Sequence, residues 1–139
     1  MTMRPAYTID HEHGCILEKW SGVVTAHDII AFNRELAQDP DYRLGLNRLI
    51  DMRGARLKAL SNEIDEMATE AINKRDASEG HRKAAILVAR DLEYGLVRML
   101  NAMSDLTLSE VRPFRRLDEA VAWLGLPETL GDPFERNSN

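Results

Sequence analysis

A run of basic side chains follows a short apolar segment near the middle of the chain. Arg53, Arg56 and Lys58 come after residues 49–52 and shortly before Ser61, which can begin a helix as its N-cap. The free amides and the dipole at a helix N-terminus attract anions, and neighbouring cations strengthen that attraction. We therefore interpret this stretch as a candidate site for an acidic group, supplied by a partner protein or by a small ligand. The alternative interpretation is a solvated loop with ordinary surface charges.

The chain offers little for catalysis or for metal binding. His11 and His13 lie two apart, so on a strand they would share a face as a metal-binding pair could, but a polar hairpin turn explains them more simply. Cys15 begins an apolar segment, which is typical of a small core residue. The sequence has no Gly-x-Ser-x-Gly, no phosphate-binding glycine loop and no His-Glu-x-x-His motif. We therefore predict that the protein is not an enzyme and needs no metal or cofactor.

The elements that must position these side chains alternate between strands and helices. Thr25 and Asp28 have the spacing of a capping box, with Asp in place of Glu, and predict the start of the first helix. Asp91 and Asp118 are expected to cap two later helices, and Gly125 to end the last one. Predicted strands cover residues 7–10, 15–24, 47–52, 84–89 and 109–114, and predicted helices start near residues 25, 61, 91 and 118. Gly54 is expected to close the third strand, and residues 53–58 to form a loop.

The order β-β-α-β-α-β-α-β-α predicts an α/β fold with a mainly parallel, five-stranded sheet and right-handed crossovers. The first strand is expected to form an antiparallel hairpin with the second. Pro113 places the last strand at an edge of the sheet, because proline cannot donate to a neighbouring strand. We expect one domain over residues 1–126 and a loosely docked tail over residues 127–139.

Ligands of open α/β sheets gather outside the carboxyl ends of the parallel strands. The loops over residues 25–28, 52–60 and 90–91 are expected to converge at that edge. The candidate binding residues there are Thr25, His27, Asp28, Asp51, Arg53, Gly54, Arg56, Lys58, Ser61, Arg90 and Asp91.

Composition limits the class of protein. The chain has 139 residues, of which 44% are hydrophobic, enough for a folded core. The net charge of −5 argues against a nucleic-acid-binding face, which is normally basic. A single cysteine excludes an intramolecular disulfide, and no apolar run has the length of a membrane span or of a signal peptide. We expect a cytoplasmic protein.

Three stretches, residues 20–25, 49–54 and 111–125, resemble the STAS domains, and most closely the stand-alone SpoIIAA-like branch that is also described as STAS/SEC14-like. The resemblance implies that strands add to the sheet in chain order while the helices follow as a right-handed superhelix. It also implies non-enzymatic work, because anti-sigma-factor antagonists of this family bind a kinase-like anti-sigma factor.

The same resemblance places a phosphorylated serine in an Asp-Ser-Ser-Gly motif, and this chain departs from that motif. The matching residues are Asp51, Met52, Arg53 and Gly54, so an arginine stands where the phosphorylated serine belongs. A guanidinium cannot accept phosphate, and we predict that the known phosphorylation switch is absent. Ser61 is a remote substitute that is more simply explained as a helix cap.

Two functions from different classes remain. The first is a regulatory module that recognises a protein partner, or a second copy of itself, through residues near Asp51 to Ser61. The second is a carrier or sensor that encloses an apolar, lipid-like ligand, as SEC14-like relatives do, with Met67, Met99 and Met103 as lining candidates. Methionines at helical spacing are also ordinary core residues.

Overall fold

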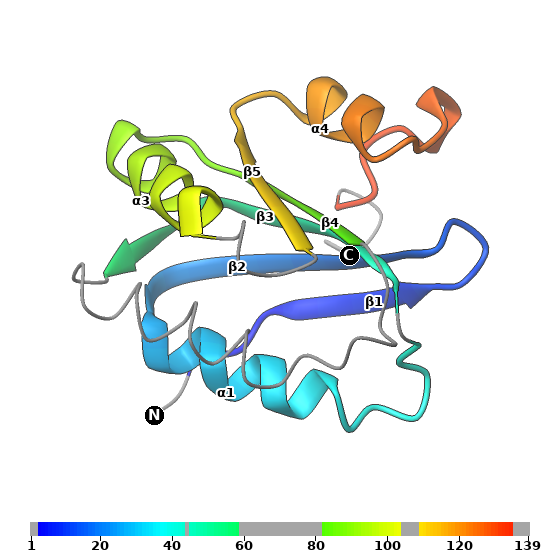
Figure 1. The fold of residues 1–139 in the computed structure, drawn as a ribbon, viewed down its shortest axis with the longest axis horizontal. Coiled ribbons are helices and arrows are strands. Elements are labelled where there is room, and N and C mark those ends of the chain that lie inside the picture. The colour runs from blue at the N-terminus through cyan, green and yellow to red at the C-terminus, as the bar shows by residue number, and fades with distance from the viewer. Residues whose placement is uncertain (1–2, 44, 59–81, 104–108, 135–139) are drawn as a thin grey trace.

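The computed structural model describes residues 3–43, 45–58, 82–103 and 109–134 (Figure 1). The predicted helix that starts at Ser61 lies outside these ranges. The described elements are β1 (Ala6–Asp10), β2 (Cys15–Thr25), α1 (Ala26–Leu36), β3 (Asn47–Lys58), β4 (Arg82–Leu87), α3 (Asp91–Met103), β5 (Ser109–Phe114), α4 (Leu117–Trp123) and the short 3-10 helix η3 (Glu128–Leu130).

The sheet has five strands in the order β1-β2-β3-β4-β5. β1 pairs with β2 antiparallel, and all other pairs are parallel. The α/β fold, the first hairpin and the edge position of the strand that carries Pro113 are therefore confirmed.

The start of α1 is held by the predicted capping box. The Thr25 hydroxyl accepts a bond from the Asp28 amide at 3.2 Å, and Asp28 accepts one from the Thr25 amide at 2.9 Å. Asp28 also accepts a bond from the Met3 amide at 3.1 Å, which ties the N-terminal segment to the helix. Burial raises the pKa of Asp28, but these hydrogen bonds outweigh burial and hold the pKa below its ordinary value.

Helices cover both faces of the sheet. α1 and α3 pack on one face, where Phe32 and Val97 join a core with Ile16, Trp20 and Val24 from β2. α4 packs on the opposite face, over a second core that includes Leu17, Leu49 and Leu87. Figure 1 shows α1 and α4 on opposite sides of the strands.

Three local predictions are wrong. The loop expected over residues 53–58 is a continuation of β3, because this stretch pairs with β2 as far as the Thr25–Lys58 pair. Asp91 and Asp118 lie within the first turns of α3 and α4 instead of capping them, and the N-cap of α4 is Arg116. Within the expected tail, Phe134 is buried in the second core.

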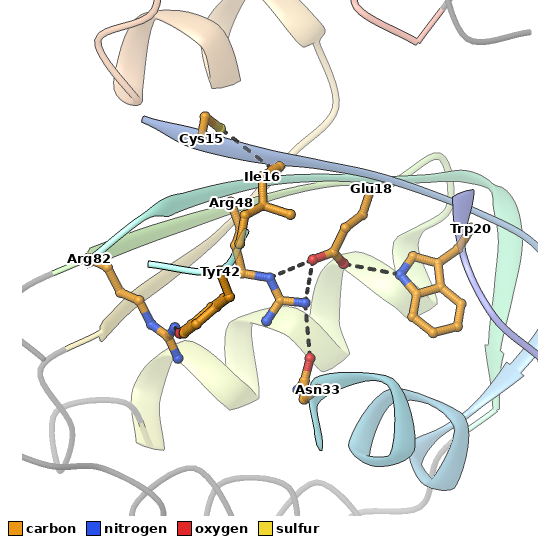
Figure 2. A network of polar contacts seen from close by, with 8 residues as sticks. All are labelled: Cys15, Ile16, Glu18, Trp20, Asn33, Tyr42, Arg48 and Arg82. Atoms are coloured by element: carbon orange, nitrogen blue, oxygen red, sulfur yellow. Dashed lines mark hydrogen bonds and ion pairs between the residues drawn. The ribbon is translucent and has the colours of Figure 1, made fainter. Parts of the chain in front are cut away.

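A buried ion pair joins β2 to β3 on the face of the sheet that α1 covers (Figure 2). The Glu18 carboxylate is fully buried and accepts bonds from Arg48 Nε at 2.6 Å and Trp20 Nε1 at 3.4 Å. Arg48 Nη2 lies 2.5 Å from the same Glu18 oxygen and donates to Asn33 of α1 at 3.0 Å. The pair therefore fixes α1 against the two central strands.

We predict that Glu18→Gln lowers the free energy of unfolding by about 3 kcal/mol, because it leaves the Arg48 guanidinium nearly buried without a counter-charge. Urea denaturation measures the change. The exposed Glu12→Gln variant is the control and should stay within about 0.5 kcal/mol of the parent. Equal stability of the two variants would show that the buried pair contributes nothing.

Candidate functional site

The site is a two-stranded ribbon that projects beyond the rest of the sheet. The last pair between β3 and β4 is Asp51 with Leu87, whereas β2 and β3 stay paired as far as Thr25 and Lys58. We call residues 21–25 with residues 54–58 the projecting ribbon.

The two faces of the projecting ribbon differ in chemistry. Val24, Ala55 and Leu57 point into the core under α1 and α3 and are buried. The opposite face carries Val23, which is 53% exposed, and the exposed side chains of Arg56 and Lys58. We call Val23, Arg56 and Lys58 the open face.

Free cations dominate the open face. Arg56 and Lys58 are two residues apart on β3, so their side chains leave the same side of the strand. Within the described part of the chain, neither side chain has a hydrogen-bonding or ion-pair partner. Two adjacent cations beside an exposed valine can hold an acidic, partly apolar surface.

Arg53 lies beside the open face and is held by Asp51. Asp51 is buried and accepts bonds from the Arg53 amide and Nε, both at 3.0 Å, and from Nη2 at 3.1 Å. The residues lie at a bulge, where the pairing of β3 with β2 shifts between Lys19 and Ser21. The hydrogen bond with Asp51 raises the pKa of Arg53, so the guanidinium stays charged.

A second carboxylate and arginine lie where α3 begins. Glu93 is 1% exposed and accepts bonds from the Leu57 amide at 3.1 Å and from Arg90 Nη2 at 2.7 Å and Nε at 2.9 Å. Burial raises the pKa of Glu93, but the bonds from Arg90 and the Leu57 amide outweigh it and leave the pKa below its ordinary value. Glu93 is therefore an ionised group that links α3 to the ribbon.

The structure brings together only part of the predicted edge. Arg53, Arg56, Lys58 and Arg90 lie on or beside the ribbon, as the contacts of β3 with Glu93 show. Asp51 and Thr25 do not converge, because Asp51 pairs with Lys19 and Thr25 pairs with Lys58 at the far end of the same strand pair. At about 3.3 Å per residue, they lie about 20 Å apart along the strands.

The remaining predicted residues have other roles. Thr25 and Asp28 form the capping box, His27 is exposed on α1, and Asp91 pairs with Arg115. Ser61 lies outside the described residues. Sequence reasoning missed Glu93, whose only signal was an acidic side chain in the first turn of a helix.

The histidines of the hairpin lie at the other end of the sheet. Residues 11–14 form a turn, and His13 Nδ1 lies 2.6 Å from Asp10 Oδ2. Donor atoms of Asp10, Glu12 and His13 lie within 4.8 Å of one another. His11 and Asp10 also line a shallow hollow of about 290 Å³ next to the segment after α4. The predicted hairpin turn is therefore confirmed, and the absence of a metal stays a prediction.

The described residues give no support to an enclosed apolar site built from the predicted methionines. Met99 is 40% exposed on α3, and Met67 and the side chain of Met103 lie outside what the structure describes. The apolar carrier therefore stays a prediction. No helix among the described residues is long and apolar enough to cross a membrane.

Comparison with known proteins identifies the fold. No family model and no curated protein matches the chain. A solved structure from Shewanella loihica, described as an uncharacterised DUF3478-family protein with a SpoIIAA-like fold, matches with a TM-score of 0.53 and 15% identity, over 88% of this chain and 94% of that one. The chain therefore has a SpoIIAA-like fold, as the sequence resemblance predicted.

We predict that the native protein does not react with a disulfide reagent such as dithionitrobenzoate at pH 8. Cys15 is buried, and burial raises its pKa to about 12, so the reactive thiolate is scarce as well as shielded. Absorbance of the released thiol measures the reaction, and urea-unfolded protein, in which Cys15 is free, serves as the positive control. Rapid reaction of the native protein would contradict the assignment of Cys15 to the core.

Proposed function

We propose that this protein is a non-enzymatic binding module of the STAS type, acting in the cytoplasm, that recognises an acidic segment of a protein partner through the open face of the projecting ribbon. The observation that carries the proposal is the pair of exposed side chains Arg56 and Lys58, which have no partner among the described residues. Arg48, Arg53 and Arg90, by contrast, are all bound to carboxylates.

The SpoIIAA-like fold supports a regulatory module but supplies no partner. In the motif of the antagonists, the residue after the Asp51 and Met52 positions is the phosphorylated serine, and here it is Arg53. The Arg53 guanidinium is bound to Asp51, which supports recognition by fixed charges without a phosphorylation switch.

The absence of activity is part of the proposal. The cysteine thiol has a raised pKa in the core, and the buried carboxylates Glu18, Asp51 and Glu93 are each bound by an arginine. A general acid or base needs an accessible group whose pKa lies near the working pH. Buried carboxylates that are bound by arginines lack this accessibility, so we assign them a structural role and not one in proton transfer.

We predict that Arg56→Glu weakens binding of a fluorescent peptide of alternating glutamate and valine about tenfold or more, because it replaces an attraction by a repulsion at the open face. Fluorescence anisotropy measures the dissociation constant. Arg56 is a better target than Arg53, whose loss would also leave Asp51 buried without its counter-charge.

The matched control is Arg43→Glu, which makes the same change of charge in the loop before β3. Its affinity for the peptide should stay close to that of the parent. In parallel, amide chemical shifts of residues 21–25 and 53–58 should move on titration of the parent protein. A peptide that leaves these amides unmoved, or equal weakening by both variants, would overturn the proposal.

A further inference from the structure

The outer edge of β3 is occupied by side chains where a neighbouring strand would lie. Among the described strands, none pairs with β3 beyond Asp51 on the side away from β2. The amide of a strand residue lies in the plane of the sheet, so the Leu57 amide, which donates to Glu93, points away from β2. The Arg53 amide is likewise taken up by a carboxylate, that of Asp51.

Carboxylates of this chain accept the hydrogen bonds that a neighbouring strand would otherwise accept. A bare strand edge presents unpaired amides and is a template for strand addition. A Glu93 oxygen lies 3.1 Å from the Leu57 amide, where a backbone carbonyl of an added strand would lie, and an Asp51 oxygen lies 3.0 Å from the Arg53 amide at the bulge. Each carboxylate belongs to this chain and so competes with any strand that approaches.

The arginines that hold these carboxylates face solvent. Arg53 and Arg90 are 36% and 43% exposed at their side chains. Together with Arg56 and Lys58 they surround the edge with positive charge. An incoming strand with acidic side chains can therefore replace both kinds of bond, with its carbonyls at the amides and its carboxylates at the arginines.

We propose that the outer edge of β3, residues 53–57, is a docking site for an extended acidic segment of the partner, which adds to the sheet as a strand, and that Glu93 closes this site as an internal competitor. The inference rests on the proposed function and names the form in which the acidic partner binds. Asp51 holds the Arg53 amide at the inner end of the edge, and the buried Glu93 holds the Leu57 amide at the outer end.

The test is the affinity of the glutamate–valine peptide for variants of Glu93. Glu93→Ala removes the competitor from both the Leu57 amide and Arg90, and we expect about tenfold tighter binding. Glu93→Gln keeps the shape of the side chain and frees mainly Arg90, so a gain of about threefold is expected. The conservative variant keeps the test valid if Glu93→Ala fails to fold.

The matched control is Asp91→Asn, which removes one negative charge from the same turn of α3 without opening the edge. Its affinity should change little. Hydrogen exchange of the Leu57 amide supplies a second measurement: the amide should exchange faster in Glu93→Ala alone and slow again when the peptide is bound. If Glu93 has only a structural role, Glu93→Ala should bind the peptide with weaker or unchanged affinity, and the peptide should not slow exchange of the Leu57 amide.

The outcomes separate this inference from the proposed function. If Arg56→Glu loses the peptide but the Glu93 variants bind no better than Asp91→Asn, the open face is the binding surface and the edge is not. If the peptide binds neither the parent nor any Glu93 variant, both proposals are wrong. Tighter binding with restored protection at Leu57 supports both.

Discussion

The unequal length of the strands is the constraint on which the rest of the site depends. The pairing of β4 with β3 ends at Asp51 and Leu87, while the pairing of β2 with β3 continues to Thr25 and Lys58. Two strands alone are barely stable in water, so the ribbon must bury one face. Val24 and Leu57 do so under α1 and α3, and because α4 packs on β4 and β5, the opposite face of the ribbon stays open.

A strand that outlasts its neighbour also leaves backbone amides that need acceptors. Glu93 satisfies the Leu57 amide from the first turn of α3, and a carboxylate this deeply buried needs a counter-charge, which Arg90 supplies. Asp51 and Arg53 repeat the arrangement at the bulge. The basic character of this region thus follows partly from the backbone, because the amides need acceptors, which here are carboxylates, and the buried carboxylates need counter-charges, which here are arginines.

The parts of the fold that could be predicted are those with local signals. Two examples are the capping box of Thr25 and Asp28 and the proline of the edge strand. Each affects the structure only of residues close to it in the sequence. The second half of β3 could not be predicted, because Gly54 and its polar neighbours look like a loop until β2 pairs with them. The burial of Glu18 was hidden for the same reason, since its partner Arg48 lies 30 residues away.

The net charge of −5 is compatible with a basic binding surface, because a bound segment interacts with nearby charges more strongly than with distant ones. At physiological ionic strength, charges more than about 8 Å apart are largely screened. An acidic segment on the ribbon therefore interacts mainly with Arg56 and Lys58, while the negative charge on distant surfaces counts for little. At low salt the whole-chain field reaches further and opposes an acidic partner, so screening removes repulsion as well as attraction. Recognition by this ribbon must then rely on close contacts, which the exposed Val23 and the backbone of β3 can supply alongside the cations.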